Sequence, residues 1–149
     1  MQKIISYPIS VIYYLCFGLT LVIFHPIQWV CFNVFGYQAH KKSVDYLNFF
    51  LVRCTNILGT TYKFKNIDSI PKGVPLIFVS NHQSMYDIIA MIWFFRRFHC
   101  KFVSKKELGK GIPSVSYNLR HGGSVLIDRK DPKQAIPAIK GLAEYIEKN

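Results

Sequence analysis

The chain has 149 residues, which leaves room for one domain and little more. Its formal net charge of +11 favours an anionic partner such as a membrane surface, a phosphorylated substrate or nucleic acid. No recognised nucleic-acid motif or dense basic run accompanies this charge, and the four cysteines have neither zinc-site nor CxxC spacing. We therefore set aside nucleic-acid binding and cysteine-based metal or redox sites.

The N-terminal region is an apolar segment of membrane type. Residues 4–24 carry no charge, and the apolar run resumes at residues 27–37 after His25 and Pro26. Residues 4–24 are long enough to span a bilayer, whose core needs about 20 residues. Their bulky aromatic residues and the lack of a small-x-small cleavage site favour an anchor over a signal peptide. We expect Pro26 to kink or break the helix, leaving a second piece of about 16 Å that is too short to cross.

Two arrangements of this anchor, residues 1–38, are open. Lys3 precedes the apolar region, and Lys41 and Lys42 follow it. Because basic flanks prefer the cytoplasmic side, a re-entrant helix pair dipping into one leaflet satisfies both ends, whereas a single span satisfies only one. We favour the re-entrant pair and expect both termini at the cytoplasmic face of a membrane, the inner membrane if the source is bacterial.

Residues 39–149 alternate between helical and strand-like patterns. Residues 43–58 predict a packing helix, and residues 62–65 alternate as in a strand with one exposed face. Residues 76–79 form a short apolar run, which is typical of a strand covered on both faces. Residues 87–98 predict a helix that is apolar nearly all round and lies in the core or against lipid.

The last third of the chain continues the same alternation. Strand-like pieces begin at Phe102 and at residue 125, and Asp131 followed by Pro132 starts a final helix with a capping side chain before a first-turn proline. Strands that alternate with helices predict an α/β fold with a mainly parallel sheet and flanking helices. The N-terminal hydrophobic helical membrane anchor precedes this domain.

The most informative motif joins a histidine to an aspartate. An apolar run ends in Asn81 and His82, and Asp87 follows five positions after the histidine. A histidine held by a carboxylate is a common general base near neutral pH. Five residues along one helix rotate by about 500°, so the two side chains can meet only if His82 lies in a turn and Asp87 on the first turn of the next helix. Ser84, between them, fits a helix-capping hydroxyl better than a nucleophile.

Three stretches together resemble one family. Residues 81–87, NHQSMYD, resemble the NHxxxxD box of the 1-acylglycerol-3-phosphate acyltransferases, also called lysophosphatidic acid acyltransferases. Residues 102–108, FVSKKEL, with Pro113 after them, are similar to that family's second box, K-x-E-L-x-x-x-x-P. Residues 123–129, GSVLIDR, are similar to its G-x-(apolar run)-D-R strand. The resemblance covers roughly residues 61–149.

The chain also departs from the family pattern. Ser116 stands where the second box usually ends in glycine, and the family's later E-G-T-R and V-P-x-x-P boxes are absent from the sequence. We therefore expect residues 39–149 to be an incomplete acyltransferase domain. A truncated, non-catalytic membrane-anchored remnant of such an enzyme is the alternative function.

The resemblance implies an enzyme of phospholipid biosynthesis. A fatty acyl group would move from acyl-CoA or acyl carrier protein to the hydroxyl of 1-acylglycerol-3-phosphate and give phosphatidic acid. His82 would be the general base and Asp87 its orienting partner, without an enzyme nucleophile, a metal or a cofactor. The expected partners are membrane lipid, the lysophospholipid acceptor and the acyl donor. The candidate substrate-binding residues are Asn81, Lys105, Glu107 and Arg129.

Overall fold

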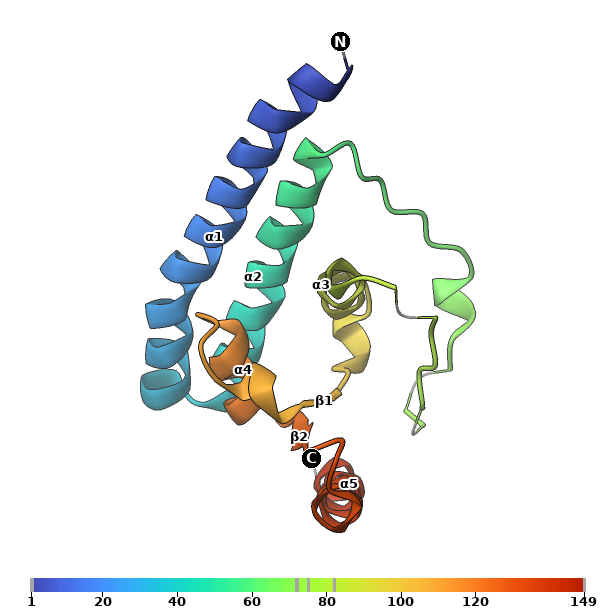
Figure 1. The fold of residues 1–149 in the computed structure, drawn as a ribbon. Coiled ribbons are helices and arrows are strands. Elements are labelled where there is room, and N and C mark those ends of the chain that lie inside the picture. The colour runs from blue at the N-terminus through green and yellow to red at the C-terminus, as the bar shows by residue number, and fades with distance from the viewer. Residues whose placement is uncertain (1, 72, 75, 82, 149) are drawn as a thin grey trace.

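The computed structural model describes residues 2–71, 73–74, 76–81 and 83–148. Two long helices, α1 (Gln2–Phe35) and α2 (Tyr37–Ile57), lie side by side as a hairpin (Figure 1). The chain reverses at Gly36, whose φ of 81° lies in the left-handed region that glycine adopts without steric cost. The predicted packing helix is thus confirmed and begins at Tyr37, six residues earlier than expected.

Pro26 does not end the first helix, so the expected break there is wrong. The helix α1 continues through Pro26 to Phe35, a length of about 51 Å at 1.5 Å per residue. Packing stabilises the helix on both sides of Pro26: α1 lies against α2, and the Ser114 hydroxyl donates to the Leu21 carbonyl oxygen at 2.6 Å in the preceding turn. Residues 2–35 therefore form one helix, and the antiparallel partner of this helix is α2, with the turn at Gly36.

The core forms where α2 lies between α1 and the helix α3 (Met85–Phe94). Leu47, Leu51 and Val52 of α2 are buried with Ile89 of α3. Aromatic side chains from α1 and from α3 complete this cluster, because one face of each helix is apolar at helical spacing. They are Phe17, Phe24, Tyr86, Trp93 and Phe94.

The remaining elements form the α/β part of the chain, and the α/β expectation is confirmed. Two short strands pair in parallel, with Val103 opposite Val125 and Lys105 opposite Ile127. The crossover between the strands contains a short helix that the sequence did not suggest. In chain order the elements are η1 (Ile67–Ser69), α3, η2 (Arg96–Phe98), β1 (Val103–Lys105), η3 (Lys106–Gly109), α4 (Val115–His121), β2 (Val125–Ile127) and α5 (Pro132–Lys148).

The expected strand at residues 76–79 is not found in the described part of the chain. Phe78 turns inward onto Phe95 and Phe98, with ring centroids 5.2 and 5.6 Å apart. Ile77 and Val79 are 93% and 91% exposed, so the segment is covered on one face only. An apolar run becomes a buried strand only when neighbouring strands pair with its backbone, and β1 and β2 pair with each other instead.

Two further expectations about elements need correction. Residues 62–65 form no strand, because Tyr62 and Phe64 pack their rings on Phe94, at 5.8 and 4.0 Å between centroids, rather than beside a second strand. The expected helix at residues 87–98 is shorter: α3 ends at Phe94, and the 3₁₀ turn η2 follows it.

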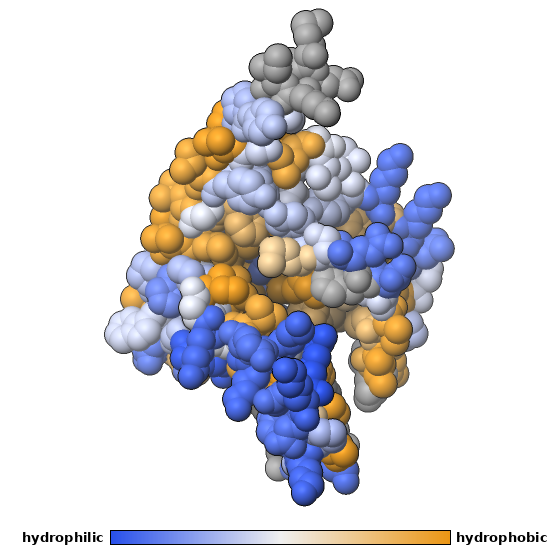
Figure 2. All heavy atoms as spheres, viewed as in Figure 1, coloured by the Kyte–Doolittle hydropathy of each residue, from blue (hydrophilic) through white to orange (hydrophobic). Residues whose placement is uncertain are grey.

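The open face of α1 is hydrophobic. By length and composition alone, Ser6–Phe35 is long and apolar enough to cross a membrane. Figure 2 shows apolar residues gathered along α1, whereas hydrophilic residues gather around α5. Large apolar side chains of α1 that are more than half exposed are Tyr7, Val11, Ile12, Tyr14, Leu15, Leu19, Val22, Trp29, Val34 and Phe35.

Candidate active site

The turn before α3 holds Asp87 in a fixed position. One oxygen of its carboxylate, Oδ2, accepts hydrogen bonds from the backbone N–H groups of Gln83 and Ser84, both at 2.9 Å. Asp87 is the third residue of α3, where the partial positive charge of the helix N-terminus also favours a carboxylate. The expectation that Asp87 lies on the first turn of a helix is confirmed.

Ser84 is the N-cap residue of α3, as the sequence indicated. Its hydroxyl accepts a hydrogen bond from the Tyr86 N–H at 3.3 Å, and with Asp87 it forms a capping box. This arrangement starts the helix at Met85, and the backbone of Ser84 itself is extended. Asn81 is exposed, and His82 lies outside the described residues. The contact between His82 and Asp87 therefore stays a prediction.

The same turn packs on the N-terminal helix. The ring of Tyr86, next to Asp87, meets Tyr13 and Phe17 of α1 edge-on, with centroids 5.9 and 6.0 Å apart. Such aromatic pairs add about 0.5–1.5 kcal/mol to the burial of the rings. The motif therefore lies directly beside the apolar helix.

Two candidate phosphate-binding residues share one edge of the sheet. Lys105 is the last residue of β1, and Arg129 follows β2 by two residues. Because the strands are parallel and Lys105 pairs with Ile127, both side chains lie at the carboxyl edge, where α/β sheets commonly bind ligands. Both are exposed, as is Glu107 in η3. Asp87 lies on α3, which leads through η2 into the start of β1.

Gln134 fixes the turn that carries Arg129, a role that no motif in the sequence indicated. Its side-chain oxygen accepts from the Asp128 N–H at 2.8 Å, and its side-chain nitrogen donates to the Leu126 carbonyl at 3.3 Å. The Asp128 carboxylate accepts from the Lys130 N–H at 2.9 Å. Arg129 thus sits in a turn pinned from both sides, which limits its freedom before any substrate binds.

Ser114, in the loop after the second box, ties that loop to α1. Its φ and ψ of 60° and −50° give a γ-turn, closed by a 2.6 Å hydrogen bond from the Val115 N–H to the Pro113 carbonyl. Such a turn is strained for a residue with a side chain, so the surroundings must hold it. The Ser114 N–H donates to His25 Nδ1 at 3.1 Å, in addition to the hydroxyl bond to α1 described above.

Ser116, which replaces the usual glycine of the second box, also has a structural role. Its hydroxyl donates to the Leu108 carbonyl at 2.9 Å and accepts from the Ile112 N–H at 3.0 Å. The side chain therefore closes the loop between η3 and α4. Serine at position 116 therefore makes hydrogen bonds within this loop, and Lys105 remains the last residue of β1.

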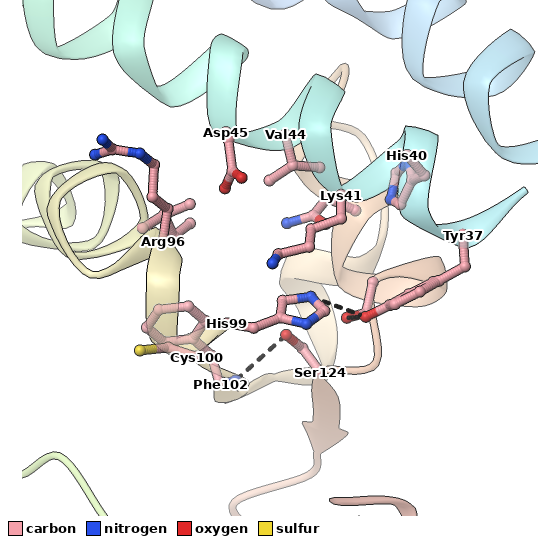
Figure 3. Close-up of a pocket in the computed structure, with 13 residues that line it drawn as sticks. Tyr37, His40, Lys41, Val44, Asp45, Arg96, His99, Cys100, Phe102 and Ser124 are labelled. Atoms are coloured by element: carbon pink, nitrogen blue, oxygen red, sulfur yellow. Dashed lines mark hydrogen bonds between the residues drawn. The ribbon is translucent and has the colours of Figure 1, made fainter. Parts of the chain in front are cut away.

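A second polar cluster lies at the opposite edge of the sheet, around a cavity between α2 and the start of β1 (Figure 3). The Lys101 ammonium donates to the Tyr37 hydroxyl, to the Gly122 carbonyl at 2.7 Å and to His99 Nε2 at 3.0 Å. Burial, together with Lys101 and Lys41, lowers the pKa of His99 to about 4. Burial and Lys41 lower the pKa of Lys101 to about 8. Near neutral pH His99 is thus uncharged and accepts from a charged Lys101.

Metal ligation finds no support in the part of the chain that the structure describes. No three His, Cys, Asp or Glu side chains there converge in a way that could hold a metal ion. His99 hydrogen-bonds to Tyr37 and Lys101 instead.

Comparison with known proteins adds to this geometry. Residues 61–149 match the protein-family model described as Acyltransferase, which covers more than half of the chain. A 1-acyl-sn-glycerol-3-phosphate acyltransferase of Helicobacter pylori is 37% identical over 90 residues, covering 60% of this chain and 37% of the relative.

Two chloroplastic proteins also named 1-acyl-sn-glycerol-3-phosphate acyltransferase match over 85 residues, or 56% of this chain. The protein of Arabidopsis thaliana is 29% identical with 23% of its length covered, and that of Brassica napus is 28% identical with 24% covered. The matched segment thus spans less than two fifths of each relative's length. No solved structure gives a significant match.

Proposed function

This chain belongs to the acyltransferase family, and on that premise we propose that it transfers a fatty acyl group from a thioester to the hydroxyl of 1-acylglycerol-3-phosphate. The product would be phosphatidic acid. The names of the relatives support this acceptor, and the fixed position of Asp87 in the matched turn is the observation that carries the proposal.

In the proposed reaction the acceptor hydroxyl attacks the thioester carbonyl while His82 takes the hydroxyl proton. The tetrahedral intermediate then expels the thiolate, which receives the proton from the imidazolium, so the histidine returns to its starting state. Asp87 orients the ring and stabilises its charged form, as the aspartate does in serine-protease triads. The pinned Oδ2 of Asp87 supports this role, because a carboxylate held by two N–H groups needs little reorganisation when the ring becomes charged.

Lys105 and Arg129 are the proposed contacts for the acceptor's phosphate. Both carry positive charge at the carboxyl edge of the sheet, and the turn of Arg129 is held by Gln134. Charge-assisted hydrogen bonds to phosphate are about twice as strong as neutral ones. Asn81 and Glu107 complete the proposed substrate-binding set: Asn81 precedes the proposed base, and Glu107 lies two residues after Lys105.

We further propose that α1 lies in a membrane at its cytoplasmic face. Its open side presents large apolar side chains, whereas its other side packs on α2, which carries Lys41, Lys42, Asp45 and Arg53. Shallow insertion of the open face buries apolar area without taking the charges of α2 into hydrocarbon, which would cost several kcal/mol. The acyl donor, acyl-CoA or acyl carrier protein, would then approach from the aqueous side.

The proposal is tested by acylation of lysophosphatidic acid in membranes that contain only this 149-residue chain, made in a host whose own enzyme is inactivated. We expect thioester-dependent formation of phosphatidic acid. Parallel reactions with glycerol-3-phosphate and lysophosphatidylcholine report the acceptor class. No transfer to any acceptor, from a chain shown to be folded by circular dichroism, would support the non-catalytic remnant instead.

A further inference from the structure

The cavity in Figure 3 lies away from the proposed active site. Its walls include Phe102 and Ser124, which precede β1 and β2 and so mark the amino edge of the sheet. Lys105 and Arg129 mark the carboxyl edge. Ile92 of α3 and Arg96 of η2 also line the cavity, and Ile92 is about 8 Å along the helix from Asp87 at 1.5 Å per residue. The cavity is therefore separate from the catalytic turn.

The lining mixes apolar and polar side chains and carries positive charge. Lys41 and Arg96 reach it from α2 and η2 (Figure 3), and the Lys101 ammonium lies 3.0 Å from His99 Nε2. Asp45 is the one carboxylate among the described lining residues, and burial raises its pKa. Lys41, Arg96 and Lys101 place positive charge at this wall, and the charges of Lys41 and Lys101 add to burial in lowering the pKa of His99. A positive potential in a partly enclosed space favours an anion.

Hydrogen-bonding groups with capacity for a ligand face the same space. His40 is 0% exposed, lines the cavity, and makes no hydrogen bond of ordinary geometry at either ring nitrogen, although the Gln28 backbone and the Asn118 side chain lie close enough to act on its pKa. A buried polar group without a partner costs about 1–3 kcal/mol, so an occupant that bonds to it is favoured. The cavity also lies at the N-terminus of α2, whose first turn has no acidic residue and whose N-cap, Gly36, supplies no side-chain bond.

The volume of the cavity and its position next to the end of α1 indicate which anion it could hold. Its volume of about 40 Å³ holds only a few atoms of water size, which is the scale of one phosphate group. Tyr37 lines it, and the preceding residues Phe35 and Gly36 end the apolar helix α1. In the shallow insertion proposed above, α1 lies at the boundary of headgroups and acyl chains, so its end is close to the lipid phosphates.

We propose that this cavity binds a phosphate group, either as free phosphate or as the headgroup of an anionic phospholipid. The proposal needs no acyl transfer, because the residues that carry it are at the opposite edge of the sheet from Lys105 and Arg129. Lys41 would be its direct cationic contact, with Arg96 and the Tyr37 hydroxyl beside it.

The test uses the full chain in neutral detergent micelles, titrated at constant ionic strength with inorganic phosphate, with short-chain phosphatidic acid, and with short-chain phosphatidylcholine. Binding is followed through the ring signals of His99 in NMR spectra, because a bound anion stabilises the protonated ring and raises its pKa above about 4. A response to both phosphate and phosphatidic acid assigns a general phosphate site. A response to inorganic phosphate alone assigns free phosphate as the ligand, and a response to phosphatidic acid alone assigns the lipid headgroup.

Matched variants show where binding occurs. Lys41→Gln should weaken it by about tenfold, the equivalent of one charge-assisted hydrogen bond. Asp45→Asn should strengthen it by removing the opposing charge. Lys42→Gln makes the same charge change one residue away, on the groove between α1 and α2, and should have no effect. Lys105→Gln, at the proposed active site, should also leave this binding unchanged.

Two results would overturn the proposal. The first is an unchanged His99 signal with both phosphate ligands, which would mean that the cavity holds water alone. The second is an equal loss of binding in Lys41→Gln and Lys42→Gln, which would show attraction to the overall charge of +11 rather than to a site.

Discussion

At the scale of single residues, Asp87 has two tasks that can be separated. Its Oδ2 atom completes the capping box of α3, and its proposed catalytic task is to hold the ring of His82. The local pattern was readable from the sequence, because Ser84 and Asp87 have the spacing of a capping box. The strained turn at Ser114 could not be predicted from the sequence, because it depends on a hydrogen bond to His25, 89 positions earlier.

Replacing Ser84 with alanine removes the cap and leaves the carboxylate in place. We expect Ser84→Ala to lower the free energy of unfolding by about 1 kcal/mol, measured by denaturant titration in micelles. This variant should keep most of the proposed acyl-transfer activity. Loss of transfer as large as that in Asp87→Asn would contradict the separation of the two tasks.

The buried ring of His99 should make stability depend on pH. Its pKa is 6.5 when unfolded and about 4 when folded, so between these values the unfolded chain binds more protons. The stability contribution is complete above pH 6.5 and is lost as the pH falls toward 4. Burial lowers the pKa values of His40 and His121 as well, which acts in the same direction.

Comparison with His99→Asn isolates this residue. We expect the free energy of unfolding to fall less steeply between pH 6.5 and 4.5 in the variant than in the unchanged chain, as measured by denaturant titration at each pH. Equal slopes for the two proteins would show that His99 does not titrate as described.

At the scale of elements, helices were predicted better than strands. A helix satisfies its own backbone, so the patterns at residues 43–58 and after Asp131 were sufficient. A strand needs a neighbour, and residues 76–79 lack one among the described residues despite their apolar sequence. The end of α1 was misplaced because Pro26 signals a break locally, whereas α1 continues through it while packed on α2.

The hairpin of α1 and α2 should depend on the buried stripe of α2. Leu51 is 1% exposed at the centre of the core, and Leu→Ala changes at such sites cost about 2–5 kcal/mol. We expect Leu51→Ala to lose that much free energy of unfolding. Tyr46→Ala, on the exposed side of the same helix, should change it by less than about 1 kcal/mol. Similar losses in both variants would contradict the assigned packing face.

At the scale of the whole molecule, α1 and α3 pack on α2, apolar residues gather along α1, and hydrophilic residues gather around α5 (Figures 1 and 2). Composition and motif order predicted the apolar anchor and the α/β part. They could not predict the cluster of Tyr37, Lys101 and Gly122, because these residues are up to 85 positions apart and match no motif. Long-range polar contacts of this kind leave no periodic signal in a sequence.

Insertion of α1 can be followed through Trp29, which is exposed on its apolar face. With Trp93 replaced by phenylalanine, brominated lipids in vesicles should quench the fluorescence of Trp29 strongly. Fluorescence as bright as in unbrominated vesicles of the same lipid would show that this face stays in water.

The central claim is that His82 and Asp87 act as one unit to deprotonate the acceptor hydroxyl. It is tested most directly by thioester-dependent acylation of lysophosphatidic acid with the purified chain, with His82→Ala, with Asp87→Asn and with the double variant. By analogy with a triad aspartate we predict a loss of about 10⁴-fold for Asp87→Asn, no turnover for His82→Ala, and no further loss in the double variant. Transfer at the level of the unchanged chain in either single variant would contradict the claim.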